Sequence, residues 1–172
     1  MIKGFFLKTL IKVVKKKKGQ EGLKILREKM GDINFSAFKS YPMTIVDTLG
    51  KAACEIIFGE WTDQKEIEFG KLSLTEWMNS SLGKTMMAFV GNDPMKISFA
   101  APRIVNTMSS GMDVNVEKLA DNKVKITIKN IPLHVNHYIG VFEAIIIYFG
   151  YKPNVTATIL APRYFEYIVE WL

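Results

Sequence analysis

The two histidines of the chain, His134 and His137, have a spacing that could place both imidazoles on one side of a helical turn and seed a metal site. However, no cysteine lies nearby, and the neighbouring acids Asp121 and Glu143 are not at a recognised ligand spacing. We therefore favour a junction between a loop and a helix, at which partly exposed imidazoles make polar contacts. We expect no metal site.

Motifs of known catalytic and nucleotide-binding sites are also missing. The sequence contains neither GxSxG nor GxGxxG, and Gly83-Lys84-Thr85 matches only the tail of a P-loop. That tripeptide lacks the upstream glycine and follows a predicted helix rather than a strand. Because no nucleophile, acid–base pair or metal cluster can be named, we expect the protein not to be an enzyme.

Glu143 stands out among the scattered carboxylates because it lies in the middle of the most apolar predicted helix, VFEAIIIYF. Two interpretations remain open. The carboxylate either lies at the helix edge and is solvated, or it is buried and paired with a lysine, an arginine or His137. A buried pair would make Glu143 a structural or ligand-binding contact.

A run of four lysines follows an amphipathic N-terminal segment and contributes strongly to the formal net charge of +6: Lys15, Lys16, Lys17 and Lys18. This run could contact an anionic membrane surface. It could equally be a solvated helix end, where lysines suit the negative pole of the helix dipole. We disfavour nucleic-acid binding, because the chain has only the arginines Arg27, Arg103 and Arg163 and no ribonucleoprotein-type aromatic motif.

The single cysteine, Cys54, excludes an intramolecular disulfide and favours a reduced, cytoplasmic compartment. Its apolar helical context, GKAACEIIFG, indicates a small core residue rather than a reactive thiol. No apolar stretch reaches the roughly 18 residues that span a bilayer. The N-terminus also lacks the small-residue cleavage site of a signal peptide.

Helical periodicity dominates the first part of the chain. We expect helices over residues 2–18, 21–30, from Tyr41-Pro42 to Gly59, 63–81, 82–91 and 95–107. The cap of the fourth is expected at Thr62 or Asp63, and Asp63 with Glu66 has the spacing of a capping box. The first helix has an apolar arc of roughly 240°, so we expect residues 2–14 to lie in the core.

The period changes after Ser109-Ser110-Gly111. Residues 112–132 alternate apolar and polar on both sides of a turn at residues 120–122, which is typical of a β-hairpin. A helix over about 136–149 and a second hairpin about Pro162 follow. We predict one α+β domain, residues 1–172. An N-terminal helical lobe (about 1–108) packs on a four-stranded antiparallel sheet in a β-β-α-β-β lobe (about 111–172).

Several short motifs occur in a characteristic order: Lys3-Gly4, Tyr41-Pro42, Phe58-Gly59-Glu60, Glu76-Trp77 before a Ser-Leu-Gly turn, and a Gly-Val-Phe-Glu helix before two closing strands. With them the chain resembles an uncharacterised bacterial family expanded in myxobacteria. That family is similar in architecture to haem–nitric-oxide/oxygen-binding (H-NOX) sensor domains and, more remotely, to vinyl-reductase-like ligand domains. The resemblance spans nearly the whole chain and implies an H-NOX-like fold.

The resemblance also identifies where haem-binding residues should lie. H-NOX sensors hold the haem iron with a histidine on the helix after the tryptophan-containing one, and here residues 95–98 read Met-Lys-Ile-Ser. Their Tyr-x-Ser-x-Arg motif, which clamps the haem propionates, aligns with Ile128, Asn130 and Pro132. Both signatures are missing, so the resemblance implies that haem is not bound in this way.

What the resemblance leaves is an apolar space between the two lobes. The residues expected to flank it are Met86, Met87, Phe89, Met95, Phe99 and Met108, with Glu143 as a further candidate. Methionine suits adaptable apolar cavities, but these side chains could also simply fill the space where haem would sit.

The sequence thus favours a non-enzymatic, cytoplasmic sensory or regulatory module. We expect it to bind a small apolar or lipid-like ligand, or to dock a protein partner, including a second copy of itself. The alternative is a peripheral membrane or scaffold protein that uses the lysine-rich end of its first helix.

Overall fold

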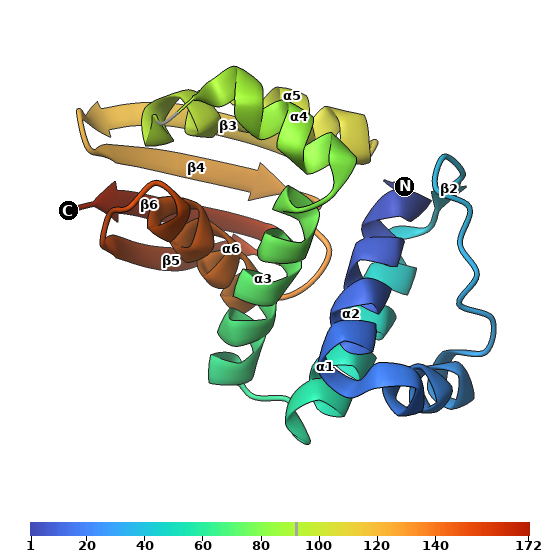
Figure 1. Ribbon diagram of the computed structural model, residues 1–172. Helices are drawn as coiled ribbons and strands as arrows, with labels where there is room; N and C mark the ends of the chain where they lie inside the picture. The colour runs from blue at the N-terminus through green and yellow to red at the C-terminus, as the bar shows by residue number, and fades with distance from the viewer. Residues whose placement is uncertain (92) are drawn as a thin grey trace.

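The computed structural model describes residues 1–91 and 93–172 (Figure 1). The helices among them are α1 (Gly4–Met30), α2 (Met43–Phe58), α3 (Asp63–Met78), α4 (Ser81–Val90), α5 (Pro94–Met108) and α6 (Val135–Tyr148). The strands are β1 (Ile2–Lys3), β2 (Ser40–Tyr41), β3 (Asp113–Ala120), β4 (Lys123–Lys129), β5 (Pro153–Ala161) and β6 (Tyr164–Trp171). The predicted α+β class and the β-β-α-β-β order are confirmed.

The main sheet is antiparallel throughout, with strand order β3-β4-β6-β5. Its central strands align so that Val124 lies opposite Val169 and Ile126 opposite Tyr167, and all four side chains are buried on one face. The opposite face carries charged pairs across neighbouring strands, such as Lys125 with Glu117. The alternation in the sequence therefore separates a helix-covered face from a solvated one.

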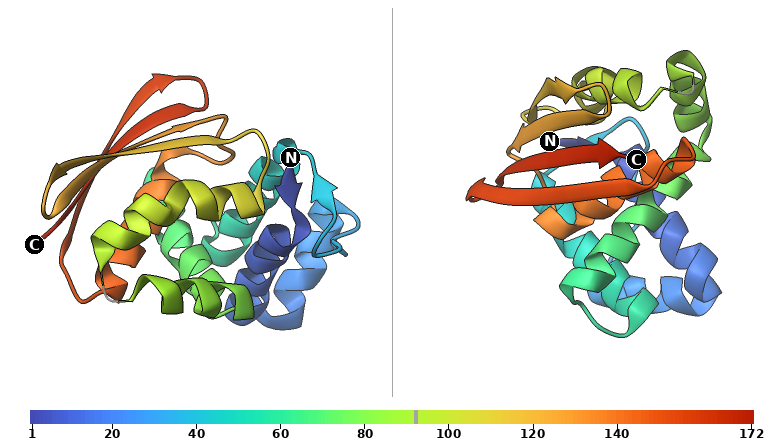
Figure 2. Two further views of the ribbon diagram at one scale, coloured as in Figure 1. Left: turned by 90° about the horizontal axis from the view of Figure 1, so that it is seen from above. Right: turned by 90° about the vertical axis from the view of Figure 1, so that its left-hand side faces the viewer.

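The helices lie on one side of the sheet (Figure 2). Helix α6 packs against β5 and β6, α5 packs against β3, and α3 packs against α6. Helices α1 and α2 pack against each other farther from the sheet (Figure 1). Among the described helices, none is both long and apolar enough to cross a lipid bilayer.

The N-terminal region was predicted as two helices over residues 2–18 and 21–30, and it differs from that prediction at residues 2 and 3. Ile2 and Lys3 instead pair with Tyr41 and Ser40 as a two-stranded sheet. Helix α1 consists of two helical segments joined by a kink at Gly19, whose φ of 62° and ψ of −149° are not helical. Only glycine adopts this conformation readily, so Gly19 ends the first segment as predicted.

The bend lets both parts of α1 contribute to one core. Val13 and Val14 before it, and Leu23 and Leu26 after it, are all buried in the same cluster with α2. We call this cluster the helical core. The prediction that residues 2–14 lie in the core is correct for most of their apolar positions, such as Leu7 and Leu10, whereas Lys8 and Lys12 are solvent-exposed.

The start of α3 shows how a cap was predicted only in part. Thr62 is the N-cap, and its side chain accepts a hydrogen bond from the Lys65 backbone N–H. Glu66 does not complete a capping box, because its carboxylate accepts a hydrogen bond from Trp61 Nε1 at 2.6 Å instead. Burial raises the pKa of Glu66, and the hydrogen bond from Trp61 opposes that rise.

Helices α3 and α6 cross at two glycines, which brings their backbones into contact. A Cβ atom at Gly70 would lie 1.9 Å from the carbonyl oxygen of His137, and one at Gly140 would lie 1.9 Å from that of Ile67. Such distances exclude any side chain at either position. This close crossing fixes the position of α3 relative to α6, and therefore which of their following residues face the sheet.

Candidate functional site

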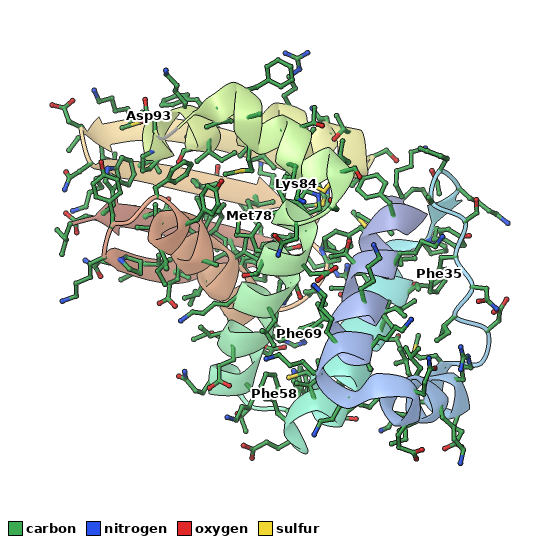
Figure 3. All side chains as sticks on the ribbon, viewed as in Figure 1. Phe35, Phe58, Phe69, Met78, Lys84 and Asp93 are labelled. Carbon is green, nitrogen blue, oxygen red and sulfur yellow. The ribbon has the colours of Figure 1, made fainter. Side chains whose placement is uncertain are left out.

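An apolar cavity of about 160 Å³ lies where α3, α5 and α6 meet the inner face of the sheet. Trp77 and Met78 of α3 form one wall, and Phe142 and Ile146 of α6 form another. Met78 lies at the end of α3 next to α4, whereas Phe69 lies earlier on α3, on the side toward α1 (Figure 3). The cavity is therefore on the sheet side of the α3–α6 crossing, and most of the helical core is on the other side, although its member Ile2 also lines the cavity.

The wall that α5 contributes contains small side chains. Ser98, Ala101 and Val105 recur at the spacing of one helix face and line the cavity. In contrast, Phe99 of α5 is 50% exposed and Phe89 of α4 is 87% exposed. The two phenylalanines thus point away from the cavity, whereas aliphatic residues of α5 such as Ile97 and Ile104 line it.

This orientation changes the predicted set of pocket residues. Met87 and Met108 line the cavity as expected. Met86 and Met95 instead pack, partly buried, against neighbouring apolar clusters. Phe89 and Phe99 face solvent, because a helix directs only one of its faces into the core and the sequence did not reveal which one.

Glu143 does not line the cavity either. Its carboxylate forms an ion pair with Lys71 Nζ at 2.6 Å and is 22% exposed. The pair joins α6 to α3 at the edge of their interface. Neither of the two interpretations is fully right, since the carboxylate is both paired and partly solvated.

The two predicted polar residues, His134 and His137, separate. His134 is exposed at the N-cap of α6, with its ring centroid 4.8 Å from that of Trp61. His137 lines the cavity and is buried, 5.5 Å from Phe69 and 5.3 Å from Tyr138 between ring centroids. The predicted loop-to-helix junction is confirmed, but the expected partial exposure is wrong for His137, because α6 turns it toward α3.

Burial determines the charge state of His137. Removal of the imidazole from water lowers its pKa from 6.5 to about 3, so the ring is neutral near pH 7. A neutral imidazole offers one N–H and one nitrogen lone pair to the cavity. The described residues contain no group of three or more histidine, cysteine, aspartate or glutamate side chains placed to hold a metal ion.

Trp77 is the functional candidate that the sequence reasoning missed. The sequence singled it out only within the Glu76-Trp77 motif of the resemblance, yet its buried Nε1 has no hydrogen-bond partner within the described part of the chain. Ser73, Leu74 and Trp77 follow one another on the same face of α3 and all line the cavity. The sequence signal that could have identified Trp77 was its spacing from Ser73, which places both polar groups on one otherwise apolar face of α3.

The wall of the cavity does not fit a haem. Within the described residues its lining includes no lysine or arginine that could hold propionates. The one lining imidazole, His137, comes from α6 rather than from α5, where the resemblance places an iron ligand. The cavity volume of about 160 Å³ is also far smaller than a porphyrin ring system needs.

The four lysines of the predicted basic surface lie beside the bend of α1 and are exposed: Lys15, Lys16, Lys17 and Lys18. We call them the lysine bend. Lys16 forms an ion pair with Glu76 of α3, whose side chain is mostly buried. The structure therefore places the run at the surface next to Gly19, away from the cavity.

The whole chain, residues 1–172, matches the sequence profile of a family described as "Protein of unknown function (DUF2378)". The chain belongs to this family. The uncharacterised family implied by the resemblance is thereby confirmed. No functionally curated protein matches the sequence significantly.

Solved H-NOX structures share the fold of this DUF2378 chain. An H-NOX protein from S. oneidensis in the Fe(II)NO ligation state superposes with a TM-score of 0.79 at 14% identity, covering 99% of both chains. An oxygen-binding H-NOX domain related to soluble guanylate cyclases gives 0.77 at 12% identity over 99% of this chain and 95% of that one. Fe(II) unliganded H-NOX from K. algicida gives 0.74 at 11% identity, covering 99% and 97%. The predicted H-NOX-like architecture is confirmed.

Proposed function

We propose that this protein is a haem-free sensory or regulatory module that binds a small apolar molecule in the cavity between α3, α5, α6 and the sheet. The observation that carries the proposal is the cavity itself, about 160 Å³ with an almost entirely apolar wall. An engineered cavity of about 150 Å³ with a similar lining stays dry and binds benzene. A molecule of that size therefore suits this space.

The small residues on α5 support a space that is kept open. Packed interiors normally leave few voids larger than a water molecule. Here Ser98 and Ala101 face the cavity while Phe99, between them in sequence, faces solvent. The protein would act without catalysis and pass its signal through contacts with a protein partner or a second copy of itself.

Binding of benzene and toluene, followed by two-dimensional NMR of ¹⁵N-labelled protein, tests this function. We expect saturable shifts of amide signals from α3, α5 and α6. Ala101→Leu should abolish them, because leucine there would occupy the cavity. Ala100→Leu is the matched control on the same helix, since Ala100 does not line the cavity, and it should bind normally. Unchanged spectra of the wild-type protein at saturating toluene would rule the function out.

The haem-free part of the proposal needs its own measurement. Addition of haemin to the purified protein should give no Soret band beyond that of free haemin. This expectation is supported by the absence of lysine and arginine from the described cavity lining and by the small volume of the cavity. A strong, stoichiometric Soret band that His137→Leu removes would contradict it.

A peripheral membrane role is the second candidate, favoured by the exposure of all four residues of the lysine bend. Flotation with vesicles containing anionic lipids would detect it. Reversal of all four charges to glutamate should abolish any flotation. The same reversal at four exposed lysines elsewhere, Lys84, Lys96, Lys118 and Lys152, changes net charge equally and should leave flotation unchanged.

A further inference from the structure

The cavity wall carries polar chemistry that narrows the class of ligand, provided that the cavity binds a small molecule as proposed above. Trp77 lines the cavity, is only 6% exposed, and has an indole N–H that is buried without a partner. Trp61, on the preceding loop, shows the usual arrangement, because its indole N–H donates to Glu66 at 2.6 Å. A buried donor without an acceptor is costly and uncommon in folded proteins.

Other polar groups of the wall already use their hydrogens. Ser73 Oγ donates to the Phe69 carbonyl oxygen at 2.8 Å, and Ser98 Oγ donates to the Pro94 carbonyl oxygen at 2.8 Å. Both hydroxyl groups are thus satisfied within their own helices. Trp77 is a wall residue whose buried donor has no partner in the described part of the chain, and the neutral imidazole of His137 offers a further polar contact.

We infer that the ligand is a small, uncharged, mainly apolar molecule that carries one hydrogen-bond acceptor, such as a carbonyl oxygen, and that Trp77 Nε1–H binds this acceptor. The acceptor restores the hydrogen bond that the indole gives up on burial. The remainder of the molecule contacts side chains such as Ile97, Ile126 and Phe142. A charged ligand is disfavoured, because the described wall offers no opposite charge to compensate for its lost hydration.

Two probes of nearly equal shape separate the acceptor from the apolar body. Cyclohexanone carries a carbonyl group where methylenecyclohexane carries a carbon–carbon double bond. We would measure the dissociation constants of both by NMR titration of wild-type protein and of Trp77→Phe. The comparison uses the ratio of the two constants within each protein, so a general change in cavity size affects both probes. We expect the preference for cyclohexanone to fall roughly five- to tenfold in Trp77→Phe.

The indole N–H signals give a second measurement, which is made on the wild-type protein and does not depend on whether Trp77→Phe folds. The chain has three tryptophans, and the resonance of Trp77 should move downfield with cyclohexanone but not with methylenecyclohexane. The resonance of Trp61 should stay in place, since its N–H is already bonded to Glu66.

The outcomes distinguish the two proposals. If neither probe binds, the proposed function fails, and the inference fails with it. If both bind, but the Trp77 resonance does not respond to the carbonyl and the preference is equal in wild type and Trp77→Phe, the inference is wrong while the proposed function stands. A carbonyl-specific shift of the Trp77 signal supports both.

Discussion

The helical core and the cavity region are both apolar, and they lie on opposite sides of the α3–α6 crossing, yet only one of them is filled. In the helical core, Leu7, Leu10, Val46 and Leu49 are completely buried. On the other side, apolar side chains mainly from α3, α5, α6 and the sheet surround a space of about 160 Å³. The two regions thus differ in how completely their side chains fill the volume between the helices.

The difference does not come from a shortage of large apolar residues. Phe89 and Phe99 lie on the helices beside the cavity and point outward, while Ala101 points in. What separates the regions is the orientation of α4 and α5, and this teaches that an apolar composition alone does not determine whether a core is closed.

The largest effect that tests this contrast is expected for Leu49→Ala. Truncation in the filled core should lower the free energy of unfolding by about 4 kcal/mol, because it creates a new void among rigid neighbours. Leu74→Ala, on the cavity wall, should cost about 2 kcal/mol, since it enlarges a space that already exists. Urea denaturation measures both values.

Leu82→Ala is the control for these truncations, because Leu82 is an exposed residue of α4, and its effect should stay within about 0.5 kcal/mol. Equal losses at Leu49 and Leu74 would mean that the two regions are packed alike.

The next effect concerns pH and the wall residue His137. Its pKa is about 3 in the folded protein against 6.5 as the ordinary value, so below pH 6.5 the unfolded chain binds a proton that the fold rejects. The burial of His137 therefore has no effect on the free energy of unfolding above pH 6.5. Below pH 6.5 it lowers that free energy by about 1.4 kcal/mol per pH unit, down to about pH 3. At pH 4.5 this loss reaches about 2–3 kcal/mol.

Carboxylates also change the stability at low pH, and a comparison of two histidine variants separates the contribution of His137 from theirs. His137→Leu should remove it from urea denaturation curves recorded between pH 7 and 4.5. His134→Leu should keep the wild-type dependence, because His134 is exposed. If both variants followed the wild-type pH profile, His137 would not be buried in the neutral form.

The smallest effect is expected at the boundary between the regions, where Lys71 pairs with Glu143. A double-mutant cycle with alanine at both positions should give a coupling energy of about 0.5 kcal/mol, since both side chains are partly exposed. Lys65 and Glu68, which pair within α3 at 3.3 Å, are the matched reference. A coupling above about 2 kcal/mol would mean that the Glu143 pair is far less solvated than the structure shows.

The elements of the fold were predictable because their signals are local. Alternation on both sides of short turns predicted both hairpins, and Gly59 ended α2 as expected. The break at Gly19 was predicted from the glycine, whose non-helical backbone separates the two segments of α1. The pairing of Ile2 with Tyr41 was missed, because it depends on residues far apart in the chain.

The candidate site was predictable only in outline. The space between the lobes followed from the resemblance, and Met108 was named correctly. Phe89 and Phe99 were not, because the facing side of a short helix depends on tertiary packing. Trp77 was overlooked for another reason: whether an indole N–H finds an acceptor is decided by neighbours from other elements.

The contact of the α3 and α6 backbones at Gly70 and Gly140 has a mechanical consequence. Two packed helices are usually separated by side chains that can change conformation, but no side chains separate the backbones of α3 and α6 at this crossing. If a molecule in the cavity displaces α6, α3 should therefore move by a similar amount. Phe69, which belongs to the helical core and also touches His137 of the cavity wall, would move with it. The filled core, whose member Ile2 also lines the cavity, would thus register whether the cavity is occupied.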